Sequence, residues 1–177
     1  MVLSKNYVKI LKELSPEEVQ KYLTTPEEAM EFYERTGVDS LAVSVGSAHR
    51  MKVQSARLDI ERITRIRERI KVPLVLHGAS GVLDESISAA IRAGIAKINF
   101  ATELNKAFTA GIKQKLSDDP GLVDVRKYGA FGRDNVKKVV KEKIRLLDSA
   151  NKAEEVLKFI SKEKHFIIQD GKPGIVE

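Results

Sequence analysis

Between residues 38 and 100, three short apolar runs alternate with amphipathic segments. The runs Val38–Gly46, Lys71–Gly78 and Ile95–Phe100 predict strands, and the first two are apolar on both faces, as in a covered parallel sheet. Apolar residues at helical spacing predict a helix over Leu58–Ile70, and a second helix is predicted over Asp84–Arg92 with the aspartate as N-cap. This order of strands and helices predicts an α/β protein with a parallel sheet.

Two capping boxes precede the alternation. Ser15-Pro16-Glu17-Glu18 and Thr25-Pro26-Glu27-Glu28 each place a hydroxyl residue at the N-cap, proline at the first helical position and glutamate at the third. The second box predicts a helix that continues to about Thr36, where Gly37 ends it.

The pattern after Thr102 is mainly helical. It predicts one helix that the Asp118–Gly121 turn ends, and a second that includes Val136 and continues through Ile160. The segment His165–Gln169 predicts a short strand. No repeat or low-complexity linker divides the chain.

Two of the three histidines follow predicted strands. His49 and His77 lie 28 residues apart, a spacing that fits one strand, one helix and a return strand. Both imidazoles are therefore predicted at the same end of a parallel sheet, where α/β proteins carry their chemistry. Without cysteine, any metal must be held by histidines and carboxylates.

The charge of the chain indicates an anionic small-molecule substrate better than a nucleic acid. The net charge is +6, and basic residues are frequent over Arg57–Lys71. Isoleucines recur there at helical spacing and no aromatic residue interleaves, so the charges are interpreted as the solvated face of a helix. No apolar stretch suffices for a membrane span or signal peptide, so we expect a cytoplasmic protein with no membrane partner.

Four linked motifs resemble those of the class II fructose-bisphosphate and tagatose-bisphosphate aldolases. They are Thr36–Val43, Gly46–His49, Pro73–Gly81, and Lys97–Asn99 followed by Ala101–Leu104. Their order and spacing also agree with the family. The resemblance covers only the C-terminal half of the family's fold.

The resemblance implies a partial (β/α)₈ TIM barrel in which the three predicted strands are the sixth, seventh and eighth. It implies three regions: residues 1–24 as an N-terminal helical extension, 25–152 as the barrel segment, and 153–177 as a C-terminal helix and tail. A whole barrel takes about 250 residues, and three strands cannot close one. A second copy or a complementary N-terminal half is therefore an expected partner.

The resemblance also implies that His49 and His77 are two of three histidine ligands of a catalytic Zn²⁺. The family's third ligand belongs to an Asp-His motif together with the catalytic aspartate, and this chain has no Asp-His pair. We therefore expect no catalytic acid or base within this half. His165 lies outside the resemblance and is not expected to replace the missing ligand.

The phosphate of dihydroxyacetone phosphate is expected at two turns, through backbone N–H groups and two hydroxyls. The residues of these turns are Gly78, Ala79, Ser80, Asn99, Phe100, Ala101 and Thr102. Arg50 stands where the family usually has glycine. Its guanidinium would either pair with a phosphate or block its close approach.

Two functions remain open from the sequence. The first is the zinc-dependent aldolase reaction, in which Zn²⁺ stabilises the enediolate of dihydroxyacetone phosphate, performed by a truncated or split half. The second is a non-catalytic remnant that acts as an interaction or phosphate-binding subunit. The sequence does not distinguish fructose from tagatose bisphosphate, because that choice depends on contacts to one hydroxyl.

Overall fold

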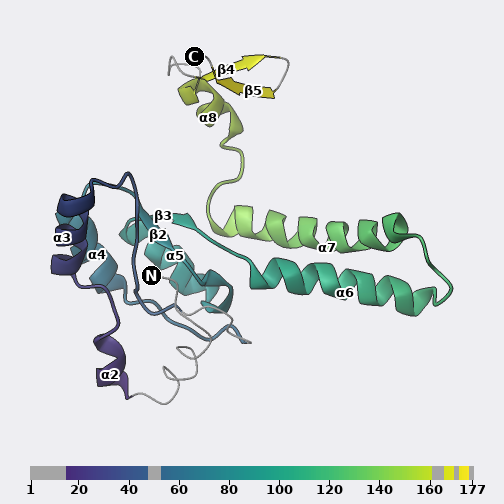
Figure 1. Ribbon diagram of the computed structural model, residues 1–177, viewed down its shortest axis with the longest axis horizontal. Helices are drawn as coiled ribbons and strands as arrows, with labels where there is room; N and C mark the ends of the chain where they lie inside the picture. The colour runs from purple at the N-terminus through teal and green to yellow at the C-terminus, as the bar shows by residue number, and fades with distance from the viewer. Residues whose placement is uncertain (1–14, 48–52, 161–165, 170–171, 176–177) are drawn as a thin grey trace. The chain divides into compact units, whose positions relative to one another are not determined.

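The computed structural model describes residues 15–47, 53–160, 166–169 and 172–175 (Figure 1). The chain forms two compact units, residues 1–141 and residues 142–177. The first unit contains a three-stranded parallel sheet and the helices that cover it, and the second contains a short helix and a β-hairpin.

The sheet consists of β1 (Leu41–Ala42), β2 (Leu74–Leu76) and β3 (Ile95–Ile98), in that spatial order. Leu41 is in register with Leu74, and Leu74 with Ile95, and both strand pairs are parallel. The predicted α/β class and the alternation of three strands with two helices are therefore confirmed.

The first strand is much shorter than Val38–Gly46. The ladder continues only as far as Val43, whose N–H donates to the Val75 carbonyl at 3.2 Å. Ser44 then pairs with Thr24 instead: its N–H donates to Thr24 Oγ1 (2.9 Å), and its carbonyl accepts from the Thr24 N–H (2.8 Å). Thr24, which lies 20 positions before Ser44 in the sequence, therefore ends the strand.

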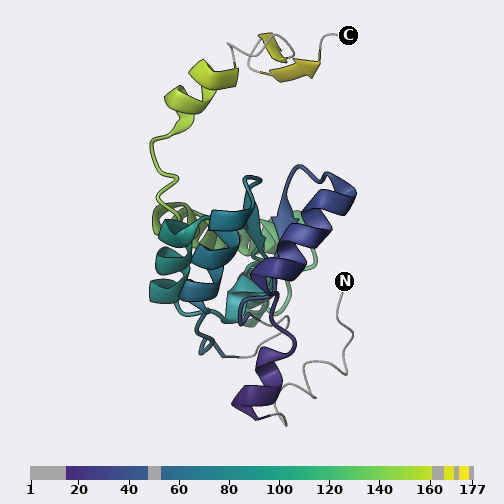
Figure 2. The ribbon, with the colours of Figure 1, turned by 90° about the vertical axis from the view of Figure 1, so that its left-hand side faces the viewer.

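Three helices lie side by side along the sheet (Figure 2): α3 (Pro26–Thr36), α4 (Ile60–Arg69) and α5 (Asp84–Ala93). Both predicted capping boxes are present, at Thr25 before α3 and at Ser15 before the short helix α2 (Pro16–Gln20). Within α4 the buried residues are Ile63 and Ile66, as the isoleucine spacing predicts. Arg65 and Arg69 lie on the exposed face, whereas the Arg62 side chain is only 12% exposed, so the predicted solvated face is confirmed only in part.

Asp84 is not the N-cap of α5, as the sequence pattern predicts. Leu83 occupies that position, and Asp84 is the first helical residue. Asp84 Oδ1 accepts a hydrogen bond from Gln54 Nε2 at 2.8 Å. The carboxylate therefore contacts a residue 30 positions away and is not the cap of its own helix.

The apolar core of the described residues lies wholly between Leu23 and Ile95. Leu74 and Leu76, which alternate onto one face of β2, are fully buried. On the opposite face Val75 is in register with Ala42 and Lys97, and both of these flanking residues are exposed. One face of the sheet is therefore covered by helices, and the other is covered only at its centre.

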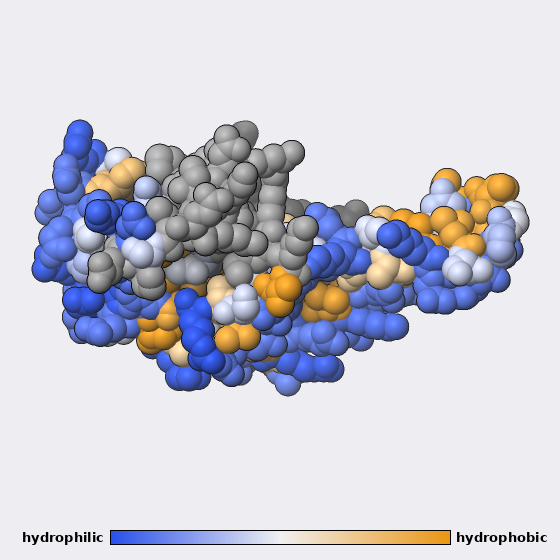
Figure 3. All heavy atoms as spheres, turned by 90° about the horizontal axis from the view of Figure 1, so that it is seen from below, coloured by the Kyte–Doolittle hydropathy of each residue, from blue (hydrophilic) through white to orange (hydrophobic). Residues whose placement is uncertain are grey.

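Helices α6 (Thr102–Asp118) and α7 (Val125–Leu146) form a hairpin that makes its closest contacts at glycines. A Cβ on Gly111 would lie 2.6 Å from the Phe131 carbonyl oxygen, and one on Gly132 would lie 2.7 Å from the Phe108 ring. These glycines are the only buried residues of the two helices within the first unit. Phe108, Leu116, Phe131 and Val140 are among the exposed apolar residues of the two helices. Figure 3 shows apolar residues among the hydrophilic ones on one face of the molecule.

The second predicted helix of this region begins earlier than its pattern suggests, at Val125, next to an ion pair. Arg126 donates to both carboxylate oxygens of Asp124 (3.0 and 2.9 Å), which holds the pKa of that carboxyl below its ordinary value. The charged form of Asp124 therefore favours the folded state above its ordinary pKa, and this contribution is lost as pH falls through the lowered value.

The prediction that this helix continues through Ile160 is wrong. Helix α7 ends at Leu146, and α8 (Ala153–Ile160) begins after a break in which Asp148 and Asn151 have positive φ. The predicted strand in the tail is present as β4 (Phe166–Gln169), paired antiparallel with β5 (Lys172–Ile175). Among the described residues, no helix is long and apolar enough to cross a membrane.

Candidate metal and phosphate site at the carboxyl edge of the sheet

The loops that follow the three strands are joined to one another by hydrogen bonds. The Ser47 hydroxyl, after β1, donates to the His77 carbonyl oxygen at 2.6 Å. The Asn99 N–H, after β3, donates to the Leu76 carbonyl at 3.0 Å. His77 therefore stands at the centre of this edge, directly after the central strand.

The imidazole of His77 is exposed, and the side chain of Asn99 contacts it. Asn99 Nδ2 lies 3.3 Å from His77 Nδ1, and because an amide nitrogen can only donate, the two form a hydrogen bond in the tautomer whose Nδ1 carries no proton. This contact restricts the orientation of the ring.

The turn after His77 begins with a backbone conformation that favours glycine. Gly78 has φ +70°, and the short helix η1 (Ala79–Gly81) follows it. The Gly81 carbonyl accepts from the N–H groups of Ser55 and Ala56, both at 2.9 Å. These two hydrogen bonds hold the end of the turn, while Ser80 remains half-buried.

The turn after β3 leads into α6. Ala101 is the N-cap without a side-chain hydrogen bond, and Thr102 is the first helical residue. Thr102 also lines an open surface depression along α6, whose lining residues, Lys106 and Lys113 among them, all come from this one helix. Lys106 lies about one turn from the N-terminus of this helix and Lys113 about three turns from it, so only Lys106 stands near enough to favour an anion at the N-terminus.

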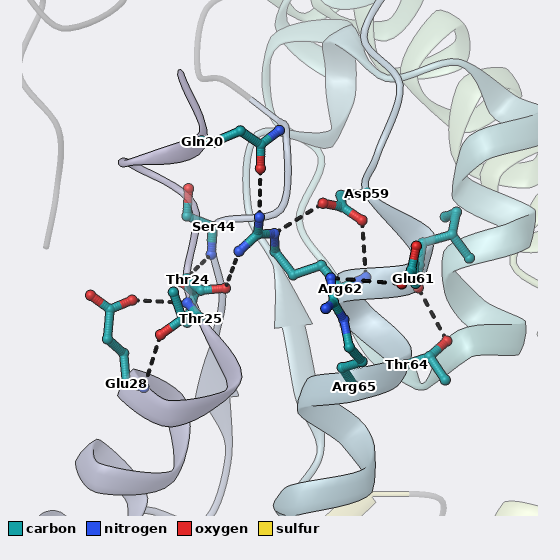
Figure 4. A network of polar contacts seen from close by, with 11 residues as sticks. Gln20, Thr24, Thr25, Glu28, Ser44, Asp59, Glu61, Arg62, Thr64 and Arg65 are labelled. Carbon is teal, nitrogen blue, oxygen red and sulfur yellow. Dashed lines mark hydrogen bonds and ion pairs between the residues drawn. The ribbon is translucent and has the colours of Figure 1, made fainter. Parts of the chain in front are cut away.

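A polar network holds the segment that leads from β1 toward this edge (Figure 4). The Arg62 guanidinium donates to Asp59 Oδ2 (3.0 Å), Gln20 Oε1 (2.6 Å) and the Thr24 carbonyl (3.2 Å). Thr24 in turn binds both backbone groups of Ser44.

The sequence did not indicate that Ser47, Gln54 and Arg62 belong to this edge of the sheet. Gln54 Nε2 donates to both the Val82 carbonyl and Asp84 Oδ1. The partners of Ser47 and Gln54 lie about 30 residues away in the chain. Only the pairing of Asp59 with Arg62 could be predicted from neighbouring residues, because their spacing of three is typical of a helix N-terminus.

The structure brings together His77, the Gly78–Ser80 turn and the Asn99–Thr102 turn. His49, Arg50 and His165 lie outside the described residues. Within the part of the chain that is described, no three His, Cys, Asp or Glu side chains group as metal ligands.

Comparison with known proteins identifies relatives of this chain. A profile of the family "Fructose-bisphosphate aldolase class-II" matches residues 9–152. Among solved structures, the YdjI aldolase from Escherichia coli K12 is 43% identical, with a TM-score of 0.63. A putative fructose-1,6-bisphosphate aldolase from Coccidioides immitis is 30% identical, with a TM-score of 0.64. The fructose-bisphosphate aldolase from Campylobacter jejuni, at 22% identity and a TM-score of 0.63, shares the fold.

The matches cover most of this chain but only part of each relative. They span 73% of the chain and 46% of the Escherichia coli structure, 75% and 45% for the Coccidioides structure, and 72% and 46% for the Campylobacter structure. The chain thus spans less than half the length of these relatives. On the family profile and on these identities, the chain belongs to the class II fructose-bisphosphate aldolase family.

Proposed function

We propose that this chain supplies the zinc and phosphate half of an aldolase site, which cleaves a ketose bisphosphate to dihydroxyacetone phosphate and an aldehyde. The observation that carries the proposal is the position of His77. It follows the central strand of a parallel sheet, contacts Asn99 from β3, and is bonded through its backbone to the loop after β1. Side chains at this end of a (β/α)₈ barrel perform its catalysis.

The donor set fits zinc, although this chain provides only part of it. His77 and His49 would be two ligands, and a third must come from outside the matched motifs. Bound zinc would act as a Lewis acid toward the substrate carbonyl. Asn99 would hold the His77 ring in one orientation, because its amide lies against Nδ1.

The two turns beside His77 would hold the substrate phosphate. Ser80 and Thr102 offer hydroxyls, and the N-terminus of α6 offers N–H groups directed toward an anion. The Asn99 N–H is already bonded to Leu76, so Asn99 would contribute through its side chain. Lys106, about one turn into α6, would add positive charge near this N-terminus.

The remaining strands of a barrel would come from outside these 177 residues, through a complementary segment or a second copy. The exposed face at Ala42 and Lys97 supports such a partner, because a closed barrel covers it. The choice between fructose and tagatose bisphosphate would depend on that partner.

A non-catalytic aldolase-like subunit is the second candidate. Arg50 in place of the family's usual glycine favours it, as does the absence of an Asp-His pair from the sequence. This subunit would retain phosphate binding, and it would not hold zinc tightly.

Zinc binding by single-histidine variants distinguishes the two. We expect His49→Ala and His77→Ala to weaken zinc binding about equally in a chelator competition, because each removes one ligand. His165→Ala is the matched control and should bind as the unaltered chain does. Unchanged zinc uptake by the His49→Ala, His77→Ala double variant would leave the non-catalytic subunit as the better interpretation.

A further inference from the structure

The two helices of the α6–α7 hairpin leave a groove open between them. The helices approach closely at their glycines, and within the first unit neither helix buries an apolar side chain. The groove lies beside this close approach. Residues of both helices line it, including Gly111, Gln114, Phe131, Lys137, Lys138 and Lys141.

The groove combines an exposed aromatic ring with positive charge. Phe131 is 45% exposed, and Lys115 Nζ lies 5.5 Å from the centroid of its ring. The three lysines that line the groove form no ion pair with any residue that the structure describes. Among the described lining residues only Asp134 is acidic. A partner that fits this surface therefore carries negative charge together with an apolar side chain.

Helix α3 has these properties on its outer side. It contains four glutamates and one arginine, and Glu27, Glu31 and Glu34 share one face of the helix. Phe32, next to Glu31, is 50% exposed. Glu27 and Glu31 pair with arginines, but these side chains are mostly exposed, so solvent screens the pairs and they exchange easily.

The spacing of the charges on the two helices agrees. On α7, Arg133, Lys137 and Lys141 follow one another at intervals of four residues. At a rise of 1.5 Å per residue they span about 12 Å, and Glu27 to Glu34 span about 10.5 Å. Two helices that lie along each other would therefore place the acidic row opposite the basic one.

We propose that the groove between α6 and α7 binds α3 of a second copy of this chain. Each copy carries both surfaces, and their charges are opposite. Direct packing of two hairpins is disfavoured, because residues 125–141 contain six basic residues and one acidic residue, and like charges repel across an interface. The contact is separate from the open sheet face at Ala42 and Lys97, and it does not depend on the zinc site.

Reversal of the charges in the full 177-residue chain tests this contact. The double variants Glu31→Lys, Glu34→Lys and Lys137→Glu, Lys141→Glu should each raise the dissociation constant of self-association about tenfold in sedimentation equilibrium, because attraction becomes repulsion at two positions. An equimolar mixture of the two double variants should associate as the unaltered chain does, since each supplies the charges that the other has lost.

Two further variants show what the contact depends on. Phe32→Ala should also weaken association, because it removes the apolar side chain from α3. The matched control is Lys97→Glu, Lys113→Glu, which changes the net charge as much as the lysine reversal does, at exposed positions outside the groove. It should associate normally. All these positions are exposed, so every variant should keep the urea midpoint of the unaltered chain.

The mixture is the decisive measurement. If the two double variants fail to associate with each other, α3 does not bind the groove. If the control weakens association as much as the lysine reversal, overall charge or the open sheet face governs association, and the proposal is wrong. A chain that stays monomeric and binds phosphatidylserine vesicles through Lys137 and Lys141 would also overturn it, because the partner would then be a membrane surface.

Discussion

At the scale of single residues, Arg62 shows how one side chain joins distant parts of the chain. Its side chain is only 12% exposed, and it binds Asp59, Gln20 and Thr24. We expect Arg62→Ala to lower the free energy of unfolding by about 3 kcal/mol, because Asp59 loses its charge partner in a partly buried position. Urea unfolding measures this loss.

Arg69→Ala is the control for that prediction. Arg69 pairs with Glu27 at 2.8 Å, but both side chains are more than half exposed. Solvent screens such a pair, so its loss should cost less than about 1 kcal/mol. If both substitutions lowered the free energy of unfolding by the same amount, the contacts of Arg62 would stabilise the fold no more than an exposed ion pair does.

Two hydroxyls carry the second residue-scale prediction. Ser80→Ala and Thr102→Ala should each weaken binding of dihydroxyacetone phosphate by roughly 1.5–3 kcal/mol, because each removes one hydrogen bond to a charged group. Isothermal titration checks the affinity. Thr109 lines the same surface depression further along α6, so the Thr109→Ala variant should bind dihydroxyacetone phosphate with normal affinity. Normal binding by both Ser80→Ala and Thr102→Ala would place the phosphate elsewhere.

At the scale of elements, the α6–α7 hairpin depends on the close approach of its glycines. Gly111→Ala should destabilise the hairpin by about 1–3 kcal/mol, because the new Cβ would meet the rigid Phe131 backbone at 2.6 Å. Hydrogen exchange of the α7 amides measures the change locally.

Gly129 offers the matched substitution on α7. A Cβ there meets only the Arg133 guanidinium, at 3.8 Å. Gly129→Ala should therefore stabilise α7 by roughly 0.5–1 kcal/mol, through helix propensity alone. If Gly111→Ala stabilised α7 as Gly129→Ala does, the two helices would not approach closely at Gly111.

At the scale of the whole molecule, the first prediction concerns activity. The 177-residue chain should have negligible aldolase activity even with zinc, because a third ligand and the group that handles the aldehyde-side proton are both absent from its motifs. A coupled assay with fructose and tagatose bisphosphates checks this. Robust cleavage of either substrate by the pure chain would require a replacement ligand.

The second whole-molecule prediction concerns association. Ala42 and Lys97 leave one face of the sheet open, and the hairpin exposes Phe108 and Phe131. Soluble monomers rarely expose contiguous apolar patches larger than a few hundred Å². We expect self-association in sedimentation experiments, or binding of an apolar dye. A compact monomer without dye binding would show that the chain covers this surface itself.

The sequence alone determined the elements whose signals are local. The capping boxes at Ser15 and Thr25, the start of β3 at Ile95 and the buried isoleucines of α4 follow from neighbouring residues, and the structure confirms them. The motifs around His77 and Asn99 also identified the aldolase family, which the family profile confirms. Such features depend on side chains within one or two turns, so a pattern along the chain suffices to predict them.

Only the tertiary structure decided what depends on distant partners. Thr24 forms hydrogen bonds with Ser44 and so ends β1. Gln54 donates a hydrogen bond to the Asp84 carboxylate, which the sequence pattern predicted to cap α5. The Ser47 contact with His77 likewise joins residues 30 positions apart. A polar group binds whichever partner the fold brings within reach, and the sequence pattern around it contains no record of a partner from another loop.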